Sequence, residues 1–138
     1  MAEALTQRQR EILEFISASI VERGFLEPIS FQGTSDIGSF FGDEYVGTGA
    51  DDIVRQSPMA VVGQVTTPTL VIHSELDYRC PLEQATRYYS ALKRQGTAAE
   101  LLVFPGENHE LTRSGQPRHR IERFEAVLDW WQRHLPVN

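Results

Sequence analysis

The sequence predicts an α/β protein in which two parallel strands are each followed by a helix. Two short aliphatic runs, residues 69–73 and 101–104, are typical of strands buried on both faces. After each run, apolar residues recur at helical spacing, and these stretches end at Gly96 and Pro136. A strand–helix–strand–helix order favours parallel strands joined by a crossover helix.

Composition limits the class of protein. The chain has 138 residues, room for one domain and a small addition, and 41% of them are hydrophobic. Thirteen basic against 19 acidic residues give a net charge of -6, which argues against nucleic-acid and anionic-membrane partners. A single cysteine, Cys80, excludes an intrachain disulfide scaffold, and no apolar run approaches the roughly 20 residues that span a bilayer. We expect a cytoplasmic protein.

The first 24 residues predict an amphipathic helix. Thr6 and Gln9 fit a capping box at its start. Gly24 is expected to end it and Pro28 to prevent its continuation. Its apolar stripe consists of Ile12, Leu13, Ile16 and Ile20.

Residues 29–67 are punctuated by glycines but also rich in aromatic side chains. They are too apolar for a linker and too interrupted for a long element. We expect short helical turns over 35–41 and 51–56, lying on a core.

The pattern becomes regular after Pro68. Pro81 is expected to open the helix between the strands, with a buried stripe of Leu82, Ala85, Tyr89 and Leu92. The last helix is predicted from the apolar residues Ile121, Phe124, Leu128, Trp131 and Leu135.

Two polar loops leave the carboxyl ends of the strands, where parallel sheets gather their functional groups. The first carries Glu75, Asp77 and Arg79, and the second carries Glu107, Asn108, His109 and Glu110. Neighbouring strands lie about 5 Å apart, so Asp77 and His109 can meet. A carboxylate that holds one imidazole nitrogen forms the base half of a nucleophilic triad. The alternative is that both are ordinary surface residues.

From residue 29 to about 135 the sequence resembles the C-terminal part of the catalytic domain of prolyl-oligopeptidase-family serine peptidases, with the acylaminoacyl-peptidase branch most similar. The resemblance rests on the runs DYRCP at 77–81 and PGENHE at 105–110, and on segments 30–38, 56–58, 66–73 and 113–120. It implies a partial α/β-hydrolase fold, with Asp77 as the triad acid and His109 as the triad base. It also implies a peptide or acyl-peptide substrate, and a division into an added helix (1–28) and a hydrolase portion (29–138).

The sequence departs from that family in its nucleophile. The family places its serine in a Gly-x-Ser-x-Gly turn upstream of the acid and the base, and no such pentapeptide occurs here. The nearest approach, residues 38–42, has the wrong spacing. The oxyanion-hole segment and the first sheet strands are missing as well. We therefore expect a truncated, recombined or engineered fragment with little or no hydrolase activity of its own.

Other nucleophiles and a metal centre are less favoured. Ser74 lacks the strained turn that exposes a nucleophile, and Ser114 is expected in a flexible loop downstream of His109. A reactive Cys80 would need a lowered thiol pKa. His73, Glu75, Asp77 and His109 can be drawn as metal ligands, but no pair has a recognised metal spacing. We expect no cofactor and no metal.

The N-terminal helix leaves a second function open. Residues 5–16 resemble the first helix of LexA-type repressors, but no recognition helix follows, so a packing helix is favoured over DNA binding. Two strands leave an open edge and an apolar face, which predicts a homodimer formed through the sheet edge or the N-terminal helix. The alternative function is a non-catalytic interaction or regulatory module, with DNA binding through 1–28 as its less favoured variant.

Overall fold

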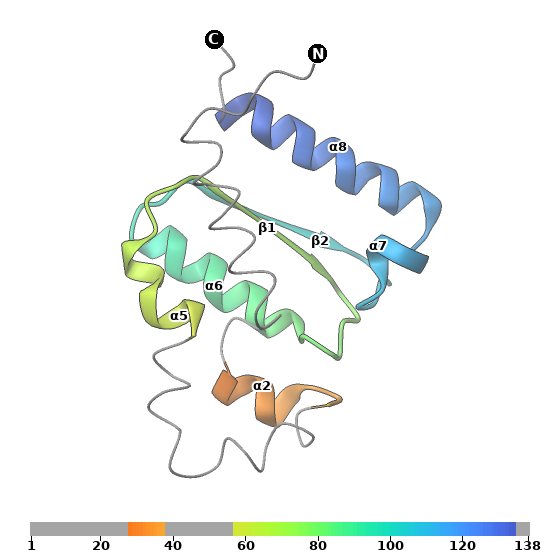
Figure 1. The fold of residues 1–138 in the computed structure, drawn as a ribbon, viewed down its shortest axis with the longest axis horizontal. Coiled ribbons are helices and arrows are strands. Elements are labelled where there is room, and N and C mark those ends of the chain that lie inside the picture. The colour runs from red at the N-terminus through yellow and green to blue at the C-terminus, as the bar shows by residue number, and fades with distance from the viewer. Residues whose placement is uncertain (1–27, 38–56, 135–138) are drawn as a thin grey trace, which may run out of the picture.

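The computed structural model describes residues 28–37 and 57–134, which form a small parallel sheet with helices on both sides (Figure 1). The predicted amphipathic helix of the first 24 residues, the turn over 51–56 and residues 135–138 lie outside this part. The described elements are, in chain order, α2 (Pro28–Thr34), α5 (Pro58–Val61), the 3-10 helix η1 (Val62–Gln64), β1 (Thr69–Ser74), α6 (Leu82–Arg94), β2 (Ala99–Phe104), α7 (Leu111–Ser114) and α8 (Pro117–His134). The predicted strand–helix–strand–helix order is confirmed.

β1 and β2 pair in parallel, with a register that runs from Thr69 opposite Ala99 to Ser74 opposite Phe104. β2 begins two residues earlier than predicted because Ala99 and Glu100 pair with the first residues of β1. Both strands therefore end at the same level, and the two following loops leave the sheet side by side. Full burial of both strands was predicted, but most of their residues are half-buried.

The core lies between α6 and one face of the strands. Ala85 and Leu92 are fully buried and pack with Val71 and Ala99. The predicted stripe of α6 is thus confirmed, although Pro81 caps the helix rather than opening it. Gly96 ends the helix as expected: its φ is 86°, and the Thr97 N–H donates to the Leu92 carbonyl.

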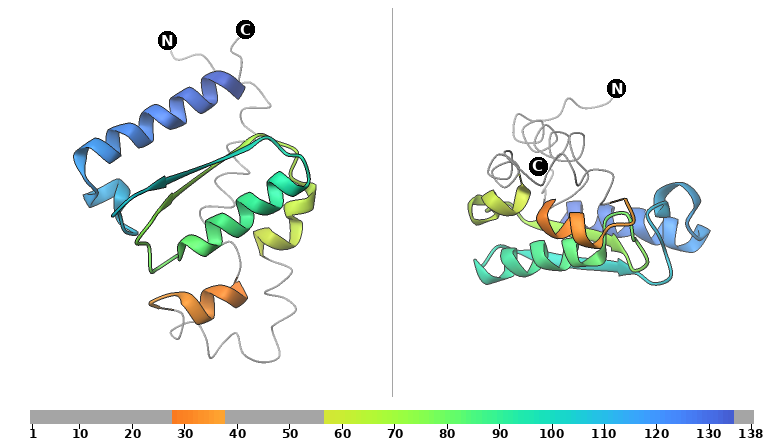
Figure 2. Two further views of the ribbon diagram at one scale, coloured as in Figure 1. Left: turned by 180° about the vertical axis from the view of Figure 1, so that it is seen from behind. Right: turned by 90° about the horizontal axis from the view of Figure 1, so that it is seen from below.

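α2 is the first element of the described part, and Pro28 is its first residue. The prediction that Pro28 prevents the N-terminal helix from continuing concerns residues outside this part. The helical turn predicted over 35–41 is not formed in its described part, because residues 35–37 make a bend and turn after α2 ends. Gln84 of α6 is almost fully buried and donates to Ser30 of α2 at 2.6 Å. Both further views place α2 near the start of α6 (Figure 2).

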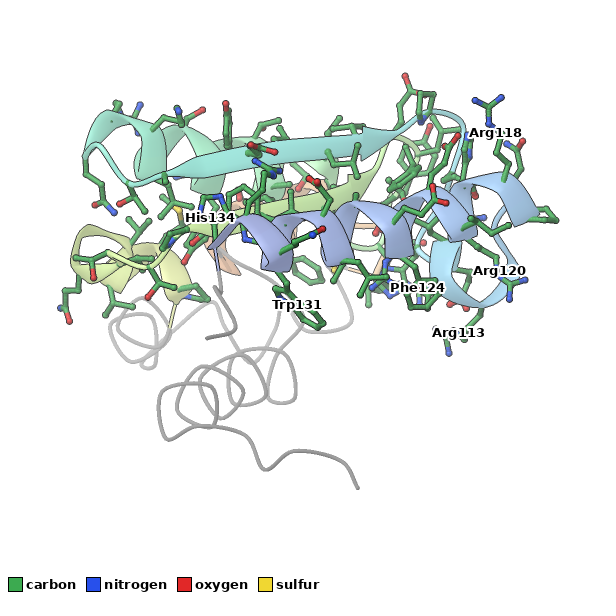
Figure 3. The ribbon with its side chains drawn as sticks, turned by 90° about the horizontal axis from the view of Figure 1, so that it is seen from above. Arg113, Arg118, Arg120, Phe124, Trp131 and His134 are labelled. Carbon is green, nitrogen blue, oxygen red and sulfur yellow. The ribbon has the colours of Figure 1, made fainter. Side chains whose placement is uncertain are left out.

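The predicted last helix is present as α8, and it lies on the side of the strands opposite α6. Its predicted apolar stripe faces outward. Ile121, Phe124, Leu128 and Trp131 are 59%, 57%, 61% and 44% exposed. Phe124 and Trp131 point away from the strands (Figure 3). The helix meets the sheet through other residues: Trp130 is buried, and Arg133 binds Glu100 of β2 through two N–H groups at 2.8 and 3.0 Å. A sheet of only two described strands, which lie about 5 Å apart, is too narrow to cover the whole apolar face of α8.

None of the described helices combines the length and the apolar character that a membrane crossing requires.

Candidate active site

Asp77 lies in the loop that follows β1, and its side chain is fixed by that loop. Its Oδ1 accepts the backbone N–H of Arg79 at 3.0 Å and that of Cys80 at 2.8 Å. The residue is 7% exposed. This local turn points the carboxylate toward the neighbouring loop and leaves Oδ2 to bind another group.

His109 occupies the loop that follows β2 and faces Asp77. Its Nδ1 lies 3.0 Å from Oδ2 and 3.2 Å from Oδ1 of Asp77. Because a carboxylate accepts, the neutral imidazole that fits this contact is the one in which Nδ1–H donates and Nε2 carries the lone pair. The side chain is 39% exposed, so this lone pair belongs to a group that solvent can reach. The predicted meeting of the two side chains is present.

Hydrogen bonds between the two loops hold this arrangement. The Glu75 N–H donates to the Phe104 carbonyl at 3.0 Å, and the Leu76 N–H donates to the Glu107 carbonyl at 2.8 Å. In return the Gly106 N–H donates to Oε2 of Glu75 at 2.8 Å. Gly106 has a φ of 71°, which favours glycine at this turn. The sheet register is therefore continued beyond the ends of the strands.

The turn after α2 supports the acid loop from its other side. The Asp36 N–H donates to the Tyr78 carbonyl at 2.7 Å, and the Ser35 hydroxyl donates to the Arg79 carbonyl at 2.6 Å. The Arg79 guanidinium binds the Asp36 carboxylate at 3.1 Å. Residues 35–36 and 78–79 are thus joined by three hydrogen bonds beside Asp77.

The ring of His73, one of the residues that could be drawn as metal ligands, reaches the acid loop. Its Nε2 lies 2.6 Å from the Cys80 carbonyl and 4.0 Å from Oδ2 of Asp77. Because a carbonyl only accepts, Nε2–H is the donor. In residues 28–37 and 57–134, no three His, Cys, Asp or Glu side chains converge in a way that could hold a metal ion.

Two of the three alternative nucleophiles, Ser74 and Cys80, lie in unfavourable settings. Ser74 is 5% exposed at the end of β1, and Ser114 lies on the short helix α7. Burial, assisted by the charge of Asp77, raises the pKa of the Cys80 thiol to about 11. A thiol with such a pKa is a poor nucleophile near neutral pH.

The arrangement can perform one half of acyl-transfer chemistry. An imidazole held by a carboxylate through Nδ1 can take a proton at Nε2, and the carboxylate stabilises the imidazolium that results. The acid and base sit on loops at the carboxyl ends of adjacent parallel strands, where such groups gather in α/β proteins.

The chain is similar in sequence and in fold to known proteins. The sequence profile of the prolyl oligopeptidase family matches residues 6–137. The chain belongs to the prolyl oligopeptidase family. The resemblance stated from the sequence is thereby confirmed, together with the partial α/β-hydrolase fold.

Individual members of the family show how much of a relative the chain covers. It is 38% identical to the uncharacterized peptidase YuxL of Bacillus subtilis, over 86% of this chain and 19% of that protein. It is 33% identical to an acylamino-acid-releasing enzyme of Arabidopsis thaliana, over 64% of this chain and 12% of the enzyme. The structure of the Pyrococcus horikoshii acylaminoacyl peptidase superposes with a TM-score of 0.74 at 32% identity, covering 80% of this chain and 19% of the peptidase. The chain thus spans about a fifth or less of these family members.

Two further residues near the site were not singled out as functional from the sequence. Glu107 was assigned only to the loop after β2, and His119 was named only within the family resemblance. Glu107 is 5% exposed, and its Oε1 lies 2.7 Å from Nδ1 of His119. A signal was available, since a charged residue two positions before His109 must either be solvated or find a partner.

Proposed function

We propose that the chain supplies the acid, Asp77, and the base, His109, of a serine-peptidase active site of the prolyl oligopeptidase type. The single observation that carries this proposal is the contact of Nδ1 of His109 with the Asp77 carboxylate at 3.0 Å. Membership of the family supports it, because the acid and base of a Ser–His–Asp triad stand in this relation. Peptides or acylated peptides are the proposed substrate class, and a cytoplasmic location is part of the same proposal.

The proposal includes little or no hydrolytic activity for the chain by itself. The sequence holds no Gly-x-Ser-x-Gly turn, and a base without nucleophile and oxyanion donors has no acyl-enzyme route. A fluorophosphonate probe tests this part. We expect no labelling of the isolated chain, and strong labelling that disappears in His109→Ala would contradict it.

A chimaera tests the acid–base role. In this chimaera, residues 28–134 of the chain replace the matching segment of the Pyrococcus horikoshii acylaminoacyl peptidase. The rest of the peptidase chain is kept. We expect fluorophosphonate labelling of the chimaera, with His109→Ala slowing it by about 10³-fold or more. His134→Ala is the matched control, because it also removes an imidazole but lies at the far end of α8 from Arg118 in its first turn (Figure 3). The His134→Ala chimaera should be labelled at the parent rate. Equal labelling of both variants would refute the role of His109.

A second candidate function, a non-catalytic interaction module, is favoured by the exposed stripe of α8. The four residues Ile121, Phe124, Leu128 and Trp131 form an apolar surface of the kind that marks association sites. We propose that the chain associates as a homodimer through this helix face, an open sheet edge or the N-terminal helix. The division into an added helix (1–28) and a hydrolase portion (29–138) belongs to this proposal.

Light scattering tests the association. At micromolar concentrations the expected mass is that of a dimer, and Leu128→Asp should reduce it to that of a monomer. Val61→Asp is the matched control, because Val61 is also exposed, at 42%, but lies on α5. A monomeric mass for the unmodified chain would contradict the proposed dimer.

A further inference from the structure

A second carboxylate–imidazole pair lies directly beside the first. Oε1 of Glu107 accepts the Nδ1–H of His119 at 2.7 Å and the backbone N–H of Gln116 at 2.9 Å. The side chains of Glu107 and His119 are 6% and 19% exposed, against 39% for His109. Glu107 and His119 are therefore less exposed to solvent than His109.

The charge state of Glu107 fixes the direction of these bonds. The Gln116 N–H, followed by the bond from His119, lowers the pKa of the Glu107 carboxyl below its ordinary value of 4.5. The ionised carboxylate accepts both hydrogen bonds near neutral pH, so His119 donates from Nδ1. The His119 ring packs on Phe104, the last residue of β2, with 5.5 Å between ring centroids.

Glu107 contacts three segments around the site. Its carbonyl accepts the N–H of Leu76, the residue before Asp77. Its own position is two residues before His109. Its side chain reaches Gln116 and His119 at the start of α8. One residue thus connects the acid loop, the base loop and the last helix.

The Glu107 carboxylate packs closely against Gly115. A Cβ added to Gly115 would lie 2.9 Å from Oε2 of Glu107 and 2.5 Å from the Leu111 carbonyl. The carboxylate therefore lies close to Gly115 and is bonded to Gln116 and His119.

We propose that Glu107 and His119 are positioning residues, which lock the loop after β2 so that His109 keeps Nδ1 on Asp77 and Nε2 directed outward. The consequence for hydrolysis rests on the function proposed above. The positioning itself is a property of this chain and needs no nucleophile. It also gives the buried charge two residues from the base a structural role.

Nitrogen NMR of the full-length chain tests the proposal, because the ¹⁵N shifts of a neutral imidazole report its tautomer. In the unmodified protein His109 should hold the Nδ1–H tautomer. Glu107→Gln and His119→Phe should each raise the Nε2–H tautomer of His109 by about threefold or more. His119→Phe keeps a ring against Phe104 but loses the donor.

Two further variants separate positioning from general damage. His119→Asn places an amide N–H near the former Nδ1 and should restore the His109 tautomer. Glu110→Gln removes a carboxylate from the same loop, one that pairs with exposed Arg113, and should change nothing. If Glu107→Gln does not fold, His119→Phe and His119→Asn decide the question. An unchanged tautomer in His119→Phe, or an equal change in Glu110→Gln, would overturn the proposal.

The outcome is distinguishable from failure of the proposed function. An inactive chimaera together with the expected tautomer changes would refute the peptidase role and leave the positioning intact. An active chimaera, together with a His109 tautomer that neither Glu107→Gln nor His119→Phe changes, would support the peptidase role and refute the positioning.

Discussion

His109 and Asp77 are 32 positions apart in the sequence, yet Nδ1 of the imidazole lies 3.0 Å from the carboxylate. The contact follows from the sheet: β1 and β2 pair in parallel and end level with each other, so their loops leave from one edge. Backbone bonds from Glu75 and Leu76 then continue the pairing into the loops. The candidate site is thus a direct product of strand register.

Cys80 is expected to be an unreactive thiol. Its pKa is raised to about 11, so at pH 8 about one molecule in a thousand carries the thiolate. Alkylation by iodoacetamide should be about 200-fold slower in the folded chain than in the chain unfolded by urea, and should accelerate as the pH rises toward 11. Equal rates in the two states would contradict the burial of this side chain.

The Glu107 carboxylate makes stability depend on pH. Because its pKa is lowered in the folded chain, the stabilisation is fully present above the ordinary value of 4.5 and is lost as the pH falls through the folded-state pKa. Urea unfolding from pH 7 to pH 3 should show the unmodified chain losing stability below pH 4.5. The difference in the free energy of unfolding between the unmodified chain and Glu107→Gln should shrink over the same pH interval. A difference that stays constant would count against an ionised, hydrogen-bonded Glu107.

The core and the exposed face of α8 should respond differently to loss of a leucine side chain. Leu92 is fully buried between α6 and the strands, so Leu92→Ala should lower the free energy of unfolding by about 2–5 kcal/mol. Leu128 is 61% exposed, and Leu128→Ala should change it by less than about 0.5 kcal/mol when the chain is diluted to a monomer. Chemical denaturation measures both, and a large effect at Leu128 in the monomer would mean that this face is covered within the chain.

Replacement of Gly115 and of Gly33 by alanine should change the stability of the folded chain in opposite directions. At Gly115 a Cβ would meet the Leu111 carbonyl and the Glu107 carboxylate, so Gly115→Ala should destabilise the chain by about 1–3 kcal/mol. Gly33 lies in α2 with nothing within 4 Å of its added Cβ. Gly33→Ala should therefore stabilise the chain by about 0.5–1 kcal/mol through its helix propensity. Thermal unfolding of the two variants distinguishes them, and a shift of the same sign in both would argue against the tight packing at Gly115.

The sequence allowed the strand–helix–strand–helix order and the Asp77–His109 contact to be predicted, because both follow from local patterns. Aliphatic runs and helical spacing identify β1, α6, β2 and α8. Polar residues directly after two parallel strands must lie at one edge. Even the end of α6 at Gly96 could be read locally, since a left-handed residue favours glycine.

Tertiary contacts account for what the sequence did not reveal. Which face of α8 is covered depends on how wide the sheet is, and periodicity alone does not tell Trp130, which is buried, from Trp131, which is not. The pairing of Glu107 with His119 joins a loop to a helix that begins ten positions later, so no short spacing pattern marks it.

The most direct test of the central claim is the rate of acyl-peptide hydrolysis by the chimaera when Asp77 is replaced by asparagine. Asparagine keeps the size of the side chain but removes the carboxylate that holds Nδ1–H of His109. We predict that Asp77→Asn lowers kcat by about 10³- to 10⁴-fold. Asp129→Asn, which changes an exposed aspartate on α8, should leave it within about twofold. A kcat for Asp77→Asn within a few-fold of the parent chimaera would show that this pair is not the acid and base of the site.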